Sequence, residues 1–282
     1  MSVWFVTGAS RGFGLEIVRE ALARGHQVVA TARHADGMRA QLPEAAEGLM
    51  TVDLDVTDQG SVAAAVVAAV GRFGRLDVVV NNAGRGVLGA VEEVSDDAAR
   101  AVFDVNVFGT LNVQRAVLPV LRRQRSGHIV NISSIGGVVG MPGWGVYCAT
   151  KFAMTGFSEA LKLELEPLGV KLTLVEPGYF RTDFLDGSSL DTEPTVIDDY
   201  AETAGTMRTS ATEYNHNQPG DPVKGAKAIV DITEHAEPPL HLLLGTDSLG
   251  FARAKLQAEL DELAGWHEVS ASTDHDDRSR TL

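Results

Sequence analysis

Short apolar runs alternate with segments of helical periodicity along most of this chain of 282 residues. In the helical segments, apolar residues recur on one face, as at Ile17, Val18, Ala21 and Leu22, which predicts amphipathic helices. The apolar runs predict seven buried strands, at residues 3–7, 27–31, 49–56, 76–80, 128–132, 171–176 and 241–244. Strands that alternate with helices predict an α/β fold, a doubly wound and mostly parallel sheet with helices on both faces.

Polar residues mark where several of these helices begin. Asp58 or Ser61 can cap the helix that runs to about residue 70, and Ser95 can cap the next one. Asp221 followed by Pro222 is an N-cap signal nearer the C-terminus. The chain has no internal repeat and no signal of a second domain, so we expect a single domain over residues 1–265.

The segment that follows the sixth strand is long and acidic. Between Thr182 and Tyr200 stand six acidic residues and no Lys or Arg. This stretch is too long for a tight connection, so we expect a mobile lid over residues 179–218 that orders on substrate binding. A last helix carries Phe251, Leu256, Leu260 and Leu263, whereas residues 266–282 are polar and predict a disordered tail.

A glycine-rich turn, TGASRGFG at residues 7–14, links the first strand to the first helix. Gly8 permits a tight turn, and Gly12 and Gly14 let backbone and helix come close to a pyrophosphate. The helix N-terminus behind them offers free N–H groups to the anion. Strand, glycine-rich turn and helix in this order predict a dinucleotide site on a Rossmann-like sheet.

The second strand ends in Ala32 and Arg33, at the position that discriminates between the two dinucleotide cofactors. An acidic residue there binds the ribose 2′-hydroxyl of NAD, whereas an arginine suits the 2′-phosphate of NADP. Arg33, with Arg11 in the glycine turn, offers two cations and no carboxylate. The sequence therefore predicts NADP(H) over NAD(H). Asp36 lies nearby and weakens the argument slightly, and either arginine has the alternative of a solvated surface position.

Tyr147 and Lys151 stand one helical turn apart, so their side chains can meet on one face. A phenol titrates near ~10 in water, and a fixed ammonium nearby favours the phenolate. Lowering the phenol pKa by roughly three units requires about 4 kcal/mol, which one lysine and an oxidised nicotinamide ring could supply. Cys148 lies between them, and we expect it to be a small packed residue, because no histidine or carboxylate is adjacent in sequence.

Composition and charge narrow the class of protein. A hydrophobic content of 44% and a charged content of 22% are typical of a globular domain. The net charge of −14 argues against nucleic acid or an anionic membrane as a partner. The longest apolar run, residues 62–70, is far shorter than the ~20 residues that span a bilayer. The single cysteine and the absence of a charged n-region after Met1 favour a cytoplasmic protein.

Taken in order, the motifs resemble those of the short-chain dehydrogenases/reductases. The set comprises TGASRGFG (7–14), Asp55-Val56, NNAG (81–84), Asn106, Ser134, YCATK (147–151) and EPG (176–178), and it extends from residue 3 to about 245. The resemblance implies hydride transfer between a carbonyl and an alcohol of a small molecule, with a nicotinamide cofactor and without a metal ion. It also implies a homodimer or homotetramer built on the helices of Asn106 and Tyr147.

The resemblance assigns roles to individual residues. Tyr147 would be the proton donor or acceptor, and Ser134 would hydrogen-bond the substrate oxygen. Lys151 would lower the Tyr147 pKa and bind the nicotinamide ribose, and Asn106 would distort its helix and hold a water linked to Lys151. Ser134 is preferred to Ser133 because the family serine usually stands thirteen residues before the tyrosine. The implied cofactor-binding residues are Gly8, Ser10, Arg11, Gly12, Phe13, Gly14, Arg33, Asp55, Val56, Asn82, Ala83, Gly84, Tyr147, Lys151, Pro177, Gly178 and Thr182.

The motifs leave the substrate open. Residues expected near it are mostly apolar: Val87, Met141, Trp144, Tyr179, Phe180 and Phe184. They favour a hydrophobic ketone, aldehyde or secondary alcohol, unless several of them simply pack in the core. Two other functions stay open, an NAD-linked alcohol dehydrogenase and a dinucleotide-sensing regulator without turnover. Ala32-Arg33 disfavours the first, and the intact set of Ser134, Tyr147 and Lys151 disfavours the second.

Overall fold

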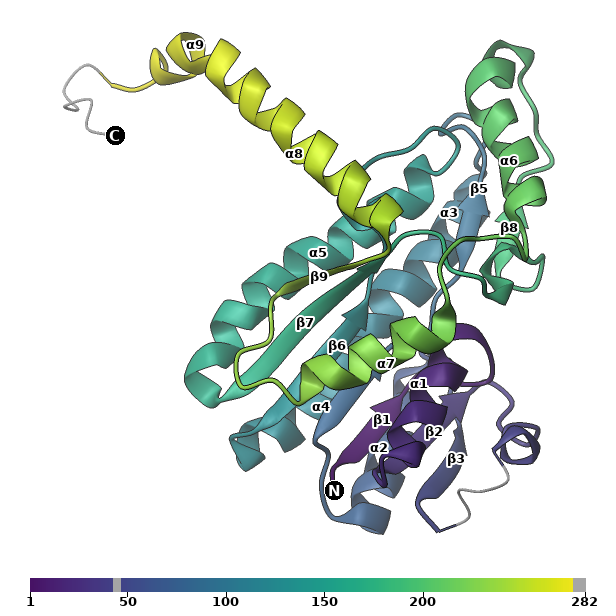
Figure 1. The fold of residues 1–282 in the computed structure, drawn as a ribbon, viewed down its shortest axis with the longest axis vertical. Helices are drawn as coiled ribbons and strands as arrows, with labels where there is room; N and C mark the ends of the chain where they lie inside the picture. The colour runs from purple at the N-terminus through teal and green to yellow at the C-terminus, as the bar shows by residue number, and fades with distance from the viewer. Residues whose placement is uncertain (43–46, 276–282) are drawn as a thin grey trace.

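A parallel sheet of seven strands forms the centre of the molecule (Figure 1). The computed structural model describes residues 1–42 and 47–275. In chain order the strands are β1 Val3–Val6, β2 Gln27–Ala32, β3 Leu49–Asp53, β4 Val78–Asn81, β6 Gly127–Ile132, β7 Val170–Pro177 and β9 His241–Leu244. Their order across the sheet is β3-β2-β1-β4-β6-β7-β9, which confirms the predicted doubly wound topology.

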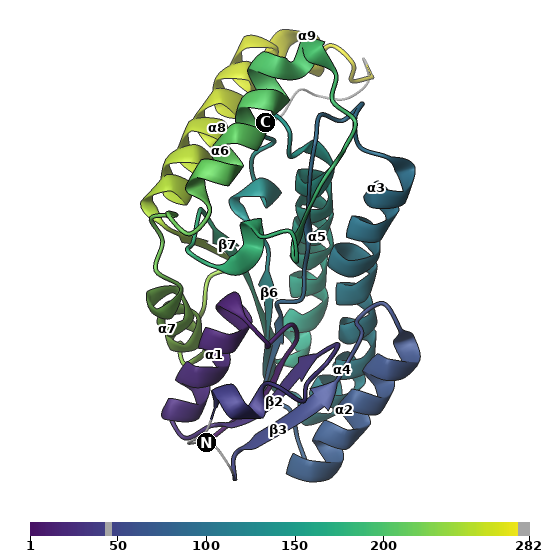
Figure 2. The ribbon, with the colours of Figure 1, turned by 90° about the vertical axis from the view of Figure 1, so that its right-hand side faces the viewer.

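Helices cover both faces of this sheet (Figure 2). One face packs against α1 (Gly12–Ala23) and α7 (Pro222–Thr233). The other face packs against α2 (Gln59–Phe73), α4 (Thr110–Gln124) and α5 (Gly145–Leu165). Successive residues of β1 point to opposite faces and all are buried, which explains why the strands read as continuous apolar runs.

The capping residues that the sequence singles out begin their helices as expected. The Asp58 carboxylate accepts hydrogen bonds from two N–H groups at the start of α2, so Asp58 rather than Ser61 is the cap. Ser95 caps α3 (Asp96–Phe103), and Asp221 caps α7 ahead of Pro222. These bonds satisfy N–H groups that a helix cannot satisfy internally, which fixes the helix starts.

The segment after β7 contains short elements that the sequence does not predict. Residues Leu190–Thr192 form β8, which pairs in parallel with β5 (Gly86–Leu88) in a second, two-stranded sheet. Helix α6 (Thr206–Tyr214) follows, and Figure 1 shows it at the same end of the molecule as α8 (Thr246–Gly265). The segment expected to be a mobile lid thus has a defined fold, while its mobility stays a prediction.

The C-terminal end of the chain is helical for longer than the sequence predicts. Helix α8 continues into α9 (His267–Ala271), which lies where a disordered tail is expected. The last part of that expected tail, residues 276–282, lies outside the described residues. Within the described ranges, no helix is both long and apolar enough to cross a membrane.

The carboxyl ends of the strands meet at one edge, where hydrogen bonds join two loops. The Thr7 hydroxyl accepts hydrogen bonds from the backbone N–H groups of Asn82 (3.0 Å) and Ala83 (3.1 Å). The Asn82 side-chain amide donates to the carbonyl oxygens of Thr7 and Gly8, both at 2.9 Å. The first turn of α1 fits tightly here, because a Cβ on Gly14 would lie 2.4 Å from the Gly8 oxygen.

We expect Gly14→Ala to lower the free energy of unfolding by about 1–3 kcal/mol, since backbone must move to admit the new methyl group. The control is Gly71→Ala in α2, where a Cβ would meet nothing within 4 Å. There alanine should raise the free energy of unfolding by roughly 0.5–1 kcal/mol, because it restricts the unfolded chain. Urea unfolding of both variants measures the contrast, and equal effects would contradict the tight packing at Gly14.

Candidate active site

A cavity of about 610 Å³ lies along the carboxyl edge of the sheet. Of the residues that the sequence assigns to cofactor and catalysis, two do not line it. Gly14 packs behind the wall, against Gly8 and Asn82, and Asn106 is fully buried in the body. The others do line it: Gly8, Ser10, Arg11, Gly12, Phe13, Arg33, Asp55, Val56, Asn82, Ala83, Gly84, Ser134, Tyr147, Lys151, Pro177, Gly178 and Thr182.

The glycine turn lines one part of this cavity. Gly8 and Gly12 have φ of 64° and 55°, in the left-handed region that favours glycine. No side chain caps the N-terminus of α1, and its first turn has no acidic residue. A helix start of this kind leaves N–H groups and a partial positive charge for an anion. The turn therefore has the donor set that a pyrophosphate requires.

At the other end of the cavity, Arg33 lies exposed at the wall formed by the ends of β2 and β3. The carboxylates of two nearby residues, Asp53 and Asp55, accept hydrogen bonds from groups other than Arg33. Asp53 accepts the backbone N–H of Ala35 at 2.7 Å. Asp55 accepts the hydroxyl and the backbone N–H of Thr57, and these bonds, with Arg33, hold the Asp55 pKa below its usual value. Arg33 thus remains an exposed cation at the end of β2, with the Asp55 carboxylate near enough to interact with it electrostatically.

Arg11, the second cation that the sequence suggests, lines the cavity and is held there by uncharged partners, so its role toward a phosphate stays a prediction. Its guanidinium donates to the hydroxyl and carbonyl oxygens of Ser188 and to the Ser189 hydroxyl. These serines belong to the segment before β8, so Arg11 ties this segment to the glycine turn. The sequence separation of 177 residues explains why no local pattern predicts this contact.

Tyr147 and Lys151 lie together on α5 and are almost fully buried, with 6% and 5% of their surfaces exposed. The Lys151 Nζ donates a hydrogen bond of 2.9 Å to the carbonyl oxygen of Ile132, at the end of β6. It lies 5.8 Å from the centre of the Tyr147 ring. The predicted spacing on one helix face is therefore confirmed.

The pKa values of this pair are governed by burial. Desolvation raises the Tyr147 pKa, and a hydrogen bond with the Ser134 hydroxyl only partly opposes it. Desolvation also lowers the Lys151 pKa to about 8. In the protein alone, each group is thus shifted toward its neutral form. The lowered phenol pKa that the sequence leads us to expect requires an oxidised nicotinamide beside Lys151, so it stays a prediction for the cofactor-bound protein.

Asn106 lies behind the cavity wall and joins two segments of the site by hydrogen bonds. It lies in a π-helical turn (Asp104–Gly109) between α3 and α4, so the expected distortion of its helix is present. Its side-chain amide donates to the Arg85 carbonyl oxygen (2.9 Å) and the Thr150 hydroxyl (3.0 Å), and its oxygen accepts the Arg85 N–H. Thr150 in turn donates to the Tyr147 carbonyl oxygen. Asn106 thus fastens the loop after β4 to the helix that carries Tyr147.

The wall beyond Tyr147 is mostly apolar, as the sequence predicts. Met141, Trp144, Tyr179, Phe180 and Phe184 line the cavity. The rings of Trp144 and Phe184 lie 5.6 Å and 5.5 Å from the Tyr147 ring. The expectation for Val87 is wrong, since this residue is buried in the hydrophobic cluster behind the wall.

Cys148 faces the same cluster. Burial raises the pKa of its thiol, which agrees with the prediction of a packed residue.

Several wall residues were not predicted because they come from the segment after β7. Asp191 forms an ion pair with Arg85 across the β5–β8 sheet, and both line the cavity. Gln218 lines it too, and neither atom of its buried side-chain amide has a hydrogen-bond partner within the described residues. Only the three-dimensional fold brings these positions to the site, and their sequence context carries no signal.

A buried ion pair anchors the same segment at its outer end. Arg208 of α6 binds the fully buried carboxylate of Glu93, which also accepts N–H groups from Ile197 and Ala90. Burial acts to raise the Glu93 pKa, but these partners hold it below its usual value. The segment is thus fixed to the body at Arg11, at Arg85 and at Glu93.

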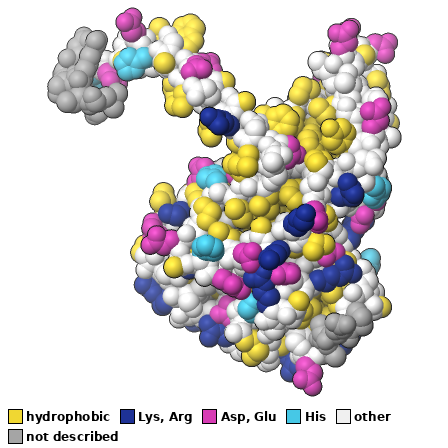
Figure 3. Space-filling model, viewed as in Figure 1, with side chains coloured by type: hydrophobic (Ala, Val, Ile, Leu, Met, Phe, Trp, Pro, Cys, Tyr) yellow, Lys and Arg dark blue, Asp and Glu magenta, His cyan; other side chains and the backbone are white. Residues whose placement is uncertain are grey.

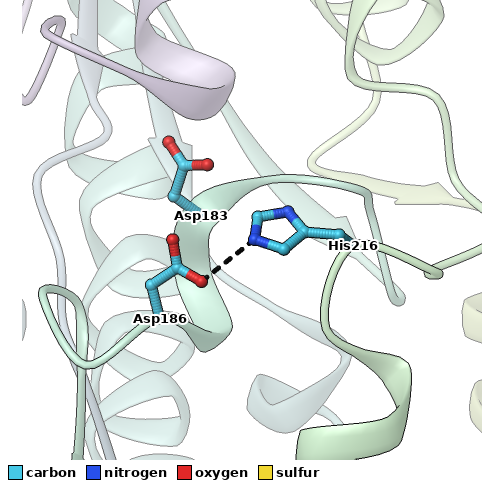
Figure 4. Close-up of side chains that lie close together, drawn as sticks. All are labelled: Asp183, Asp186 and His216. Carbon is cyan, nitrogen blue, oxygen red and sulfur yellow. Dashed lines mark ion pairs between the residues drawn. The ribbon is translucent and has the colours of Figure 1, made fainter.

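A further group of side chains in this segment is drawn in Figure 4. Asp183, Asp186 and His216 bring their ligating atoms within 4.8 Å of one another. The His216 Nε2 lies 3.2 Å from the Asp186 carboxylate, which also accepts the Asn215 amide at 2.7 Å. These contacts fasten the loop after α6 to the turn at Asp183–Leu185. Partly exposed acidic groups of this kind gather commonly without an ion, so the group by itself does not indicate a metal site.

The comparisons with known proteins agree on one family. The family model described as short chain dehydrogenase matches residues 2–193. "Oxidoreductase BOA17" of Botryotinia fuckeliana is 40% identical over 274 residues, which cover 96% of this chain and 98% of that protein. The 3-ketodihydrosphingosine reductase of Bacteroides thetaiotaomicron is 37% identical over 241 residues, 85% of this chain and 86% of the relative.

Solved structures agree. A short-chain dehydrogenase from Streptomyces avermitilis superimposes with a TM-score of 0.90 at 38% identity, over 97% of this chain and 100% of the other. ElxO with NADP bound superimposes with a TM-score of 0.74 at 26% identity, over 89% of this chain and 100% of the other.

Proposed function

Because this chain belongs to the short-chain dehydrogenase/reductase family of oxidoreductases, we propose that it interconverts a carbonyl compound and an alcohol by hydride transfer with NADP(H). The observation that carries the proposal is the convergence of Ser134, Tyr147 and Lys151 on the cavity that also receives the glycine turn. One end of the cavity can therefore hold an anionic dinucleotide, and the other presents a proton donor.

The residues along the cavity fit a dinucleotide. The uncapped N-terminus of α1 suits the pyrophosphate, and the tight contact at Gly14 keeps that helix start close to β1. Lys151 would bind the ribose next to the nicotinamide, and Thr182 and Pro177-Gly178 would form the wall behind the ring. The dinucleotide, when bound, supplies or accepts the hydride.

NADP(H) is the cofactor that the charges at the end of β2 favour. Arg33 is exposed there, and the nearby Asp53 carboxylate is held by the Ala35 N–H. A 2′-phosphate would gain a charge-assisted bond to Arg33, which a 2′-hydroxyl would not gain.

Residues of this chain supply and transfer the proton. In the reductive direction, the Ser134 and Tyr147 hydroxyls hydrogen-bond the carbonyl oxygen, and the Tyr147 proton moves to that oxygen as its carbon receives the hydride. This leaves a phenolate, which the Lys151 ammonium stabilises at close range in a desolvated site. The high Tyr147 pKa in the protein alone keeps the phenol protonated, which suits a general acid.

The substrate class follows from the far wall. Met141, Trp144 and Phe184 present apolar surface next to Tyr147, so a hydrophobic ketone or aldehyde, or the corresponding alcohol, would displace water from it.

The second candidate function is a dinucleotide sensor that binds the cofactor without turnover. The convergence of Ser134 with the buried Tyr147 and Lys151 speaks against it, because sensing needs no proton relay.

The first test replaces the proton donor. Tyr147→Phe should lower turnover by about 10²–10⁴-fold, the usual contribution of a general acid, and leave cofactor affinity unchanged. Lys151→Met should lower both turnover and cofactor affinity, because it removes the cation and the ribose contact. NADPH absorbance with a panel of hydrophobic carbonyls and alcohols gives the rates, and calorimetric titration gives the affinities.

Cys148→Ser is the control, since Cys148 is buried beside Tyr147 without a proposed role in the reaction. It should keep turnover within a few-fold of the native rate. Near-native turnover in Tyr147→Phe would remove this residue from the mechanism and favour the sensor.

A second test addresses cofactor choice. Arg33→Ala should weaken NADPH binding about tenfold or more, since a charge-assisted bond to phosphate is worth roughly 1.5–3 kcal/mol. NADH binding should change little. Calorimetric titration of both cofactors against native and variant protein measures the ratio of the two affinities.

Arg11→Ala is the matched control, because Arg11 is held by Ser188 and Ser189. It should affect NADPH and NADH alike. Equal affinities of the native protein for the two cofactors would contradict the proposed role of Arg33.

A further inference from the structure

Gln218 is a buried polar residue without a role in the proposed proton transfer. Figure 3 shows charged side chains on the outer surface around α7, where water can satisfy them. Gln218 stands shortly before α7 in the chain, but it is only 1% exposed, and it lines the cavity. Among the described residues, neither its Nε2 nor its Oε1 has a hydrogen-bond partner. The protein and the bulk water thus leave the N–H donors and the carbonyl acceptor of this amide unsatisfied.

Hydrogen bonds hold the backbone of Gln218 and Gly220 against the loop that follows β7. Arg181 donates from its Nε (3.3 Å) and from a terminal nitrogen (3.1 Å) to the Gln218 carbonyl oxygen. The Gly220 N–H donates to the Tyr179 carbonyl oxygen, and the Gly220 oxygen accepts the Arg181 N–H, both at 2.9 Å. The backbone of Gln218 is therefore fixed beside residues 179–181.

This position lies at the nicotinamide end of the proposed cofactor site. Residues 179–181 stand in the chain between Pro177-Gly178 and Thr182, which would form the wall behind the nicotinamide ring. Thr182 also faces the glycine turn, since a Cβ on Gly12 would lie 3.5 Å from the Thr182 side chain. Gln218 is thus attached to the wall of the cavity that the ring would contact.

The unsatisfied amide of Gln218 requires a ligand group that both donates and accepts. Buried donors and acceptors without partners are unfavourable, and native proteins contain few of them. A phosphate or a carboxylate could accept from Nε2, but at neutral pH neither would donate to Oε1. The hydroxyl of an alcohol substrate is assigned to Ser134 and Tyr147. A primary carboxamide offers an N–H donor and a carbonyl acceptor side by side, and the nicotinamide ring carries one.

We propose that Gln218 binds the carboxamide of the nicotinamide ring, its Nε2 donating to the carboxamide oxygen and its Oε1 accepting from the carboxamide N–H. This inference rests on the proposed function, because it requires a nicotinamide dinucleotide in the cavity. Two hydrogen bonds to one side group of the ring would restrict the rotation of the ring about its bond to the ribose. Gln218 is then a cofactor-binding residue outside the sequence motifs, supplied by the segment after β7.

The test compares NADP⁺ with acetylpyridine adenine dinucleotide phosphate, in which a methyl group replaces the carboxamide NH₂. The native protein should bind this analogue about tenfold more weakly than NADP⁺, because Oε1 loses its donor. Gln218→Met keeps the length of the side chain without its polar atoms, so it should bind NADP⁺ about tenfold more weakly than the native protein. The same variant should bind NADP⁺ and the analogue alike. Calorimetric titration measures all four affinities without turnover.

Gln257→Met is the matched control, because it makes the same substitution at an exposed glutamine of α8, whose amide donates to Asp261. It should keep both native affinities.

Thermal unfolding separates a bond to the cofactor from a role in the fold. Without cofactor, Gln218→Met should unfold at the native temperature or above it, because it removes a buried amide that has no partner. NADP⁺ should raise the unfolding temperature of the native protein more than that of the variant. A variant that unfolds well below the native temperature without cofactor would show that Gln218 has a partner inside the protein, and would overturn the proposal.

Equal native affinities for NADP⁺ and the analogue would also overturn the proposal and leave the proposed function standing. A Gln218→Met variant that binds both dinucleotides like the native protein would overturn it too, and a raised KM for the carbonyl compound in that variant would assign the amide to the substrate. A native protein that binds neither dinucleotide would instead contradict the proposed function, and the assignment of Gln218 with it.

Discussion

The site depends on a buried ammonium beside a buried phenol. Lys151 has lost most of its contact with water, and the Ile132 carbonyl oxygen is the hydrogen-bond acceptor that the structure gives its Nζ. Burying a charge costs several kcal/mol unless polar partners replace the water, so burial favours the neutral form of this lysine and lowers its pKa. Its pKa near 8 leaves it mostly charged at neutral pH, and a new charge or dipole nearby would shift this pKa. The opposite shift at Tyr147 has the same cause.

The surrounding fold keeps this pair in place. Packing of α5 on the sheet sets the distance from Lys151 to the end of β6, and the π-helical turn at Asn106 ties the loop after β4 to Thr150. On the other side, Thr7 and Asn82 join the glycine turn to the same loop. The glycine turn and the Tyr147–Lys151 pair are therefore linked through one loop, residues 82–85. A displacement of either part would therefore displace the other through this loop.

The sequence predicts those features that local patterns determine. Apolar runs identify the seven strands of the main sheet, capping residues mark the helix starts, and parallel strand order then brings their carboxyl-end residues to one edge. What it misses depends on contacts distant in the chain. The Arg11–Ser188 bonds and the Glu93–Arg208 pair join residues more than a hundred positions apart. The three-residue strands β5 and β8 are too short to show a period. The burial that raises the Tyr147 pKa in the protein alone is also not visible in the sequence, because spacing reveals a neighbouring charge but not the loss of water. For α8, the apolar positions predict a helix, whereas their exposure emerges only from the fold.

If desolvation controls the ionisation of Tyr147 and Lys151, then the titration of Lys151 reports on it directly. The ¹³Cε signals of the lysines can be followed by NMR against pH in the cofactor-free protein, with the Lys151 signal assigned by its absence from Lys151→Met. We expect a titration near pH 8, with Lys151 charged below that value and neutral above it. A Lys151 signal that titrates near the ordinary value of 10.5 would rule out control by desolvation, because it would mean that the ammonium remains hydrated in the folded protein.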